Sequence, residues 1–304
     1  MKSGFGCSLF AAALWLLLSN TGFSAAPHFR VATYNVENYL DEPTKTRPAK
    51  SEASKAKIRE SILALKPDVL ALEEMGSLEA LQGLRAALNS EGLDFPYWEL
   101  VSGSDTNVHI ALLSKFPFLA SRPRTNDNFL LGGRRFRVSR GFGEVDIQVH
   151  PHYTFTLIAA HLKSKRPIPI ADEEELRIEE AKILREEIDS RFAVNANVNL
   201  IVVGDFNDTK DSLSTRAVIG RGRHRLIDTR PGERNGDADE TERNITWTHF
   251  YAKEDSYSRI DYILLSPGMA KGWIKKETSV LSIPGWGIGS DHRPLVAEFE
   301  AQGQ

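Results

Sequence analysis

Short apolar runs of strand length recur along nearly the whole chain, and this pattern limits the folds that are open to it. Each run is rich in Val, Ile, Leu or aromatic residues, as expected of strands buried in a sheet. They cover residues 29–36, 67–75, 109–115, 143–150, 154–162, 198–206, 259–266 and 293–300. Helical periodicity is confined to fewer segments, residues 51–65, 77–88 and 171–189. Many strands with few helices predict an α/β fold in which two sheets pack face to face and helices lie outside them.

The same pattern excludes other folds. A doubly wound Rossmann sheet would need about as many helices as strands, and no GxGxxG or GxxxxGK loop follows a strand.

The composition does not change along residues 27–304, which we therefore predict to form a single domain. The acidic run in the helical segment 171–189 is expected on a solvated helix face.

The first 26 residues have the pattern of a secretory signal peptide. Lys2 precedes an apolar run at 9–18, which is too short to span a bilayer comfortably, and Ser24 and Ala26 stand at the −3 and −1 positions of a cleavage site. We therefore expect an exported protein, periplasmic or secreted, without stable membrane insertion after cleavage. An uncleaved membrane anchor is the alternative. The only cysteine, Cys7, lies within this segment, so the mature chain has no disulfide framework.

The overall charge argues against a protein that coats nucleic acid. The chain has 38 Lys and Arg against 41 Asp and Glu, a formal net charge of −3. Bulk electrostatic attraction to phosphates needs a basic surface. An enzyme that contacts phosphates only at its active site is compatible with this charge balance. We expect the protein to be a monomer.

Polar residues recur where the predicted strands begin or end. Carboxylate and amide side chains of this kind prefer Mg²⁺, Mn²⁺ or Ca²⁺ to zinc, and a histidine beside them can move a proton or stabilise charge on a phosphoryl oxygen. Each motif also has a simpler interpretation: GDFN can be a tight turn, RIDY an ion pair at a strand start, and a lone strand histidine a core residue. Only their joint occurrence at strand ends favours one shared site.

Six motifs, in order, carry a resemblance to a known family. TYNVEN, LALEEM, HLKSK, GDFND, SRIDYILLS and SDHRPL extend over roughly residues 30–299. The chain thereby resembles the endonuclease/exonuclease/phosphatase superfamily, which has the DNase I-like fold. The resemblance implies an α/β (α+β) four-layer sandwich of two packed, mostly antiparallel β-sheets flanked by helices. It also implies divalent-metal-dependent hydrolysis of phosphoesters.

The resemblance also implies a metal site. Asn35 and Glu74 match metal-site residues, with Glu74 as the principal ligand, and Asp291 matches a second metal-site residue. Glu73 stands where many members of the family have Gln, so we leave it out of the ligand set. The expected cofactor is Mg²⁺, with Mn²⁺ or Ca²⁺ as alternatives.

The predicted catalytic residues come from the same matches. His161 matches a histidine placed against the phosphate, as an acid or as a donor to a phosphate oxygen. Asp205 and Asn207 match the pair that orients or activates the attacking water. His292 matches the histidine next to the scissile phosphate, and Asp261 matches the carboxylate that would hydrogen-bond to it, which predicts a contact of roughly 3 Å.

The substrate class is the finer prediction. The stretch RRFRVSRGF at 134–142 combines arginines with aromatic residues, which suits phosphates and bases. We therefore expect a nuclease, with Arg135, Arg140 and Lys163 binding the nucleic acid. The charges could instead protect a hairpin edge from aggregation. The alternatives are a phosphomonoesterase, a sphingomyelinase-like phospholipid phosphodiesterase, or a non-catalytic binding module.

Overall fold

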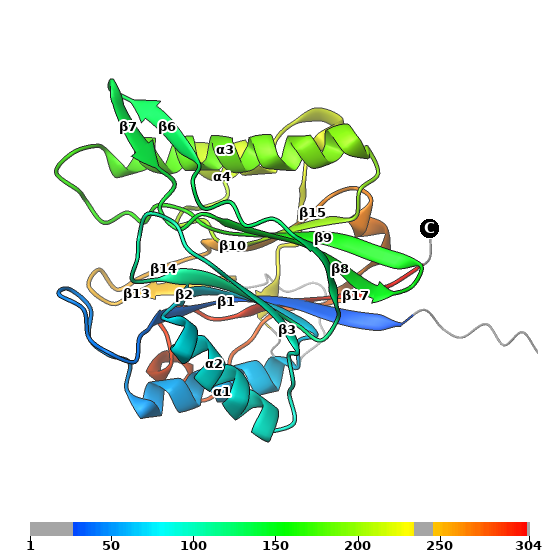
Figure 1. Cartoon of the computed structure of the whole chain (residues 1–304), viewed down its shortest axis with the longest axis horizontal. Helices are drawn as coiled ribbons and strands as arrows, with labels where there is room; N and C mark the ends of the chain where they lie inside the picture. The colour runs from blue at the N-terminus through cyan, green and yellow to red at the C-terminus, as the bar shows by residue number, and fades with distance from the viewer. Residues whose placement is uncertain (1–26, 234–245, 303–304) are drawn as a thin grey trace, which may run out of the picture.

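The computed structural model describes residues 27–233 and 246–302. The predicted signal peptide lies outside the described residues. Two large sheets pack face to face, and helices cover both outer faces (Figure 1). The predicted α/β sandwich of the DNase I-like type is therefore confirmed.

The first sheet has seven strands and includes both ends of the described chain. In spatial order the strands are β12 (Gly232–Glu233), β16 (Trp273–Val280), β17 (Leu295–Glu300), β1 (His28–Tyr39), β2 (Val69–Met75), β4 (His109–Ser114) and β3 (Tyr97–Val101). The pairs β1–β2 and β12–β16 are parallel, and the other pairs are antiparallel.

The second sheet has six strands. Their order is β11 (Ile227–Asp228), β15 (Asp261–Leu265), β10 (Leu200–Asp205), β9 (Tyr153–His161), β8 (Phe142–His150) and β5 (Phe118–Ser121). Only β9–β10 is parallel. Two hairpins stand apart from both sheets, β6 (Asn128–Leu131) with β7 (Arg134–Arg137), and β13 (His249–Tyr251) with β14 (Ser256–Ser258).

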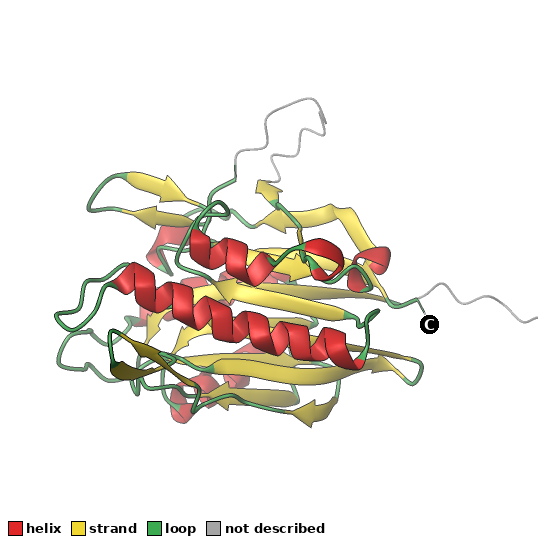
Figure 2. Ribbon diagram, turned by 90° about the horizontal axis from the view of Figure 1, so that it is seen from above, coloured by secondary structure: helices red, strands yellow, loops and turns green. Residues whose placement is uncertain are grey.

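The helices form the two outer layers. On the seven-stranded sheet lie α1 (Glu52–Leu65) and α2 (Leu78–Ser90), and on the six-stranded sheet lie α3 (Glu173–Val194) and α4 (Leu213–Ile219) (Figures 1 and 2). Short 3₁₀ turns occur at Gly222–His224, Met269–Gly272 and Trp286–Ile288. Within the described residues, none of the helices has the length and apolar character needed to cross a membrane.

Strand alternation divides the apolar side chains among three cores. Successive residues of a strand point to opposite faces of its sheet. Thus Val31 packs between the two sheets, whereas the next residue, Ala32, packs under α1 and α2. In β10, Ile201 faces the core between the sheets and Val202 faces the layer of α3 and α4.

The acidic run of α3 is not wholly solvated, contrary to the sequence prediction. Glu180 and Glu187 are buried. One oxygen of Glu180 accepts hydrogen bonds from the backbone N–H and the hydroxyl of Ser139, at 2.8 and 2.6 Å, and the other accepts from the backbone N–H of Lys163 at 2.7 Å. A buried carboxylate needs such partners, so Glu180 fixes two loops against the helix.

Gly204 is the tightest backbone position in the centre of the six-stranded sheet. Its φ is +128°, and a Cβ placed there would lie 1.9 Å from the carbonyl oxygen of Ala160 on the neighbouring strand. Both the dihedral angle and the contact with backbone therefore exclude a side chain. We predict that Gly204→Ala lowers the free energy of unfolding by about 3 kcal/mol or more, measured by urea denaturation.

Gly83 provides the matched control for this change. It lies within α2, and a Cβ there would meet nothing within 4 Å. Gly83→Ala should raise the free energy of unfolding by about 0.5–1 kcal/mol, because alanine has the higher helix propensity. Equal effects of the two substitutions would contradict the proposed role of Gly204.

Candidate active site

Three predicted catalytic residues lie side by side across the six-stranded sheet. Asp205 ends β10, where it pairs with His161 at the end of parallel β9 and with Asp261 at the start of antiparallel β15. Because β9 and β10 run in parallel, both strands bring their carboxyl ends to the same edge. All three residues are buried. The sheet register therefore assembles the centre of the site.

Asn35 connects this row to the other sheet. It lies on β1, opposite Glu73 of β2. Its side-chain amide donates a hydrogen bond of 3.0 Å to Asp205, and its backbone carbonyl accepts one of 2.7 Å from the hydroxyl of Ser290. Asn35 thus contacts β10 through its side chain and the 290–293 segment through its backbone.

The predicted contact between Asp261 and His292 is present. Nδ1 of the imidazole lies 2.9 Å from one oxygen of Asp261 and 3.2 Å from the other. The backbone N–H of His292 donates to the Ser290 hydroxyl at 3.0 Å. These contacts direct Nε2 toward Asp205 at 3.8 Å and Asp291 at 3.9 Å.

The two buried histidines have opposite electrostatic environments. For His292, burial disfavours the cation, but Asp261 and Asp205 outweigh it and raise the pKa well above its usual value. For His161, burial and then the nearby charge of Arg140 lower the pKa well below its usual value. His292 is therefore held as a cation, and His161 as a neutral imidazole that can still donate one hydrogen bond.

Asp205 and Asn207 form both the predicted pair and a tight turn. Asn207 has a φ of 54°, and its backbone N–H donates to Asp205 at 2.7 Å. Its side-chain amide donates to the carbonyl oxygen of Leu162 at 3.0 Å and to Asp205 at 3.3 Å. Burial, followed by the charge of Asp261, raises the pKa of Asp205 to about 7. Thus the turn interpretation of GDFN is compatible with its place in the site.

Strained backbone holds the carboxylates at the mouth of the site. Glu37, Asn38 and Glu74 have φ values of 44°, 50° and 62°, which cost about 1 kcal/mol or more for each L-residue. Hydrogen bonds stabilise this geometry, because the N–H of Asn38 donates to Glu74 and that of Glu37 to the side-chain oxygen of Asn35, both at 2.9 Å.

The oxygen atoms at this mouth fit a divalent cation. Oε2 of Glu74 accepts a hydrogen bond from the backbone N–H of Asn38, whereas Oε1 lies 3.9 Å from Nε2 of His161. Asp291 is partly exposed, and its charge, like that of Glu74, acts on Glu37 and Lys50. Hard oxygen donors of this type suit Mg²⁺, and a bound cation would offset the buried negative charge and polarise a phosphoryl oxygen. Glu74 and Asp291 would hold it, with Asn35 nearby.

Glu73 behaves differently from Glu74, its neighbour. It is fully buried and accepts a hydrogen bond of 2.8 Å from Thr33. Burial, followed by the nearby charge of Asp261, raises its pKa well above the usual value. A neutral, buried carboxyl is a poor cation ligand, which agrees with leaving Glu73 out of the predicted metal set.

Potential ligand atoms also form tighter groups than the sequence indicated. Within the described ranges, the ligand atoms of His249, Asp291 and His292 lie within 4.8 Å of one another, as do those of Asp205, Asp261 and His292. Glu74 belongs to neither group. His249 lies outside the six motifs and was missed; the only sequence signal is its place in a short apolar stretch that precedes SRIDYILLS.

Two of the three predicted substrate-binding residues, Arg140 and Lys163, lie close enough to His161 for their charges to act on it, and the third does not. Arg140 is buried near His161 and donates to the carbonyl oxygen of Leu162 at 3.2 Å. Lys163 directs its ammonium to the carbonyl oxygens of Ser164 and Arg166, at 2.8 and 2.9 Å.

Arg135 is the most remote of the three, because it stands on the exposed β6–β7 hairpin. There it donates to the side-chain oxygen of Asn128 at 2.5 Å. No hydrogen bond or ion pair among the described residues joins it to Asp205 or His292.

Lys50 was not predicted, yet its ammonium reaches the carbonyl oxygen of Glu37 at 2.5 Å, beside the metal-site carboxylates.

Comparison with known proteins identifies the class. The model of the Endonuclease/Exonuclease/phosphatase family matches residues 32–292, and the chain belongs to this family. It is therefore a metal-dependent phosphoester hydrolase with the DNase I-like fold. No match was found among curated protein sequences.

Solved structures agree with the fold. Sphingomyelinase C from Streptomyces griseocarneus has a TM-score of 0.62 and 18% identity, covering 90% of this chain and 100% of that one. The human nocturnin catalytic domain has 0.63 and 18%, covering 91% and 96%. Truncated Caenorhabditis elegans TDP2 has 0.62 and 16%, covering 90% and 98%. At these identities the likeness concerns the fold alone.

We predict that His292→Gln lowers kcat on bis(p-nitrophenyl) phosphate with Mg²⁺ by about 10²–10⁴-fold, because the site loses its cationic imidazole. Asp261→Asn should lower kcat less, since the imidazole remains but its proton is no longer stabilised. EDTA should abolish turnover, and added Mg²⁺ should restore it.

His152→Gln is the matched control, because His152 is exposed on the β8–β9 turn. It should leave kcat unchanged. Turnover of His292→Gln within twofold of the wild type would show that the described cluster is not the reaction centre.

Proposed function

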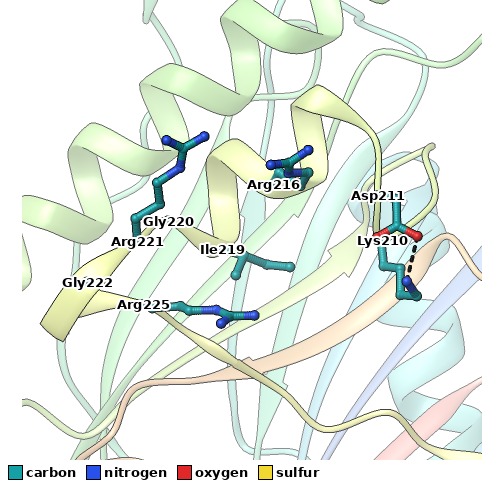
Figure 3. A pocket seen from close by; sticks show the side chains of 8 residues that line it. All are labelled: Lys210, Asp211, Arg216, Ile219, Gly220, Arg221, Gly222 and Arg225. Atoms are coloured by element: carbon teal, nitrogen blue, oxygen red, sulfur yellow. Dashed lines mark hydrogen bonds and ion pairs between the residues drawn. The ribbon is translucent and has the colours of Figure 1, made fainter.

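We propose that the protein is a nuclease that cleaves nucleic-acid phosphodiester bonds at the Asp205–His292 cluster by attack of a metal-assisted water. The observation that supports a polyanionic substrate is a cationic surface that begins three residues after Asn207 in the chain. Figure 3 shows the residues that line its pocket, which come from α4, the turn that follows it, and Lys210 and Asp211 just before it.

This surface, which we call the α4 surface, is strongly biased in charge although the whole chain is slightly acidic. It has a pocket of about 360 Å³ whose charged lining residues are Lys210, Asp211, Arg216, Arg221 and Arg225. Lys210 pairs with Asp211 at 2.5 Å. No side-chain hydrogen bond or ion pair within the described residues engages the three arginines, which are exposed. Exposed arginines grouped in this way can contact phosphates along a nucleic-acid backbone.

Aromatic side chains provide a second contact type on the β13–β14 hairpin. Tyr251 and Tyr257 are 41% and 58% exposed. The hairpin is fixed to the active site, because the N–H of Phe250 donates to the carbonyl oxygen of Asp291 at 2.9 Å. Exposed rings beside a phosphodiester site can stack on bases.

A phospholipid headgroup is the second candidate substrate. The same exposed tyrosines, with Ile288 at 55% exposure, could contact a lipid surface. Sphingomyelinase C is also among the solved structures with this fold. The α4 surface favours nucleic acid, because a phosphocholine headgroup has no net negative charge and offers a single phosphate.

We expect the purified protein to cut DNA or RNA oligonucleotides with Mg²⁺, and to lose this cutting in EDTA or with His292→Gln. Gel electrophoresis of labelled single- and double-stranded substrates is the measurement, with sphingomyelin vesicles and p-nitrophenyl phosphate as parallel substrates. Cleavage of sphingomyelin or the monoester, with none of any nucleic acid, would contradict the proposal.

We expect Arg221→Glu/Arg225→Glu to raise KM for a 30-nucleotide substrate about tenfold or more, because repulsion replaces two phosphate contacts. The slope of a plot of log KM against the logarithm of the salt concentration should decrease by up to about two. Turnover of bis(p-nitrophenyl) phosphate should not change, since that substrate is too small to reach the α4 surface.

Lys271→Glu/Lys275→Glu is the charge-matched control, on exposed residues near the start of β16. This variant should leave KM near that of the wild type. Equal losses in the two double variants would indicate an effect of net charge and would exclude a specific role for the α4 surface.

A further inference from the structure

His249 is held against the candidate active site by backbone pairing. It starts β13 and forms an isolated bridge with His292. On either side, the N–H of Phe250 donates to the carbonyl oxygen of Asp291 at 2.9 Å, and the N–H of Arg293 donates to that of Thr248 at 2.6 Å. The position of His249 relative to Asp291 is therefore set by the same ladder that positions His292.

The side chain of His249 is directed at the carboxylate of Asp291. Its Nε2 lies 3.5 Å from Asp291 Oδ2. The imidazole is 18% exposed, and the carboxylate is 41% exposed. Two neighbouring ligands about 2.2 Å from an octahedrally coordinated ion such as Mn²⁺ lie roughly 3.1 Å apart, so one cation could bind both atoms after a small shift.

His292 is less well placed than His249 for this role, because its Nε2 lies 3.9 Å from Asp291 rather than 3.5 Å. Its Nδ1 is engaged by Asp261 at 2.9 Å, and its Nε2 lies 3.9 Å from Asp291 and 3.8 Å from Asp205. The two imidazole rings have centroids 4.6 Å apart at an angle of 42°. His249 is therefore the more exposed of the two neighbouring imidazoles that face Asp291, at 18% against 6% for His292.

The chemistry of this pair differs from that of the oxygen donors at Glu74. An imidazole nitrogen suits first-row transition metals, whereas Mg²⁺ and Ca²⁺ prefer oxygen ligands. We propose that His249 and Asp291 form a nitrogen–oxygen ligand pair for a transition-metal ion, and that this pair makes the protein bind Mn²⁺ in preference to Mg²⁺. The proposal rests on the metal-dependent class and does not require a nucleic-acid substrate.

Pulsed electron paramagnetic resonance of the Mn²⁺-loaded protein, without substrate, tests direct ligation. The wild type should show modulation from a directly bound ¹⁴N nucleus. His249→Gln should lose it, while His292→Gln and the exposed control His152→Gln should keep it. Absence of the ¹⁴N signal in the wild type, or its persistence in His249→Gln, would overturn the proposal. If His249→Gln does not fold, His249→Asp takes its place, because it also removes the nitrogen.

Metal preference is the second measurement, by calorimetric titration of metal-free protein with Mn²⁺ and Mg²⁺. His249→Asp replaces the nitrogen by an oxygen ligand and should lower the ratio of Mn²⁺ to Mg²⁺ affinity about tenfold or more, while both ions still bind. If His249 only formed a hydrogen bond to Asp291, the substitution would weaken the binding of both ions alike and leave the ratio of their affinities unchanged. That result would refute ligation. Neither measurement involves turnover, so a failure of this proposal can be distinguished from a failure of the proposed nuclease function.

Discussion

The rest of the site depends on the contacts that the buried carboxylate of Asp205 makes. It lies in the six-stranded sheet between His161 and Asp261 and accepts a hydrogen bond of 3.0 Å from Asn35 of the other sheet. A buried carboxylate is costly unless such partners surround it. The two sheets must therefore keep one relative position at this end of the sandwich, and the residues that depend on this position include His292.

This constraint explains why two histidines of the same family signature differ in charge. His161 is enclosed on β9 close to Arg140, so its neutral form is favoured. His292 faces Asp261 and Asp205, so its cation is favoured. A cationic donor and a neutral donor on either side of Asp205 allow the site to stabilise a phosphoryl oxygen without two adjacent positive charges.

Much of the fold and the core of the site could be predicted from the sequence, because strand ends carry local signals. Asp205 follows an unbroken apolar run, and Asp261 starts another, so sheet pairing alone brings them together. His249 and Lys50 could not be predicted in this way, because neither lies in one of the six motifs at strand ends. The buried Glu180 was predicted to be solvated, because its partners are backbone groups of loops distant in sequence.

The sequence by itself determined where eight of the strands and the helices α1, α2 and α3 lie along the chain, and the residue types available for metal-dependent hydrolysis. These follow from local periodicity and from motifs at strand ends. Only the tertiary structure decided which donors share a pocket, because that depends on the register between strands far apart in the chain. It separated Arg135 from the site and placed His249 against Asp291, since the β6–β7 and β13–β14 hairpins are positioned by packing and long-range hydrogen bonds.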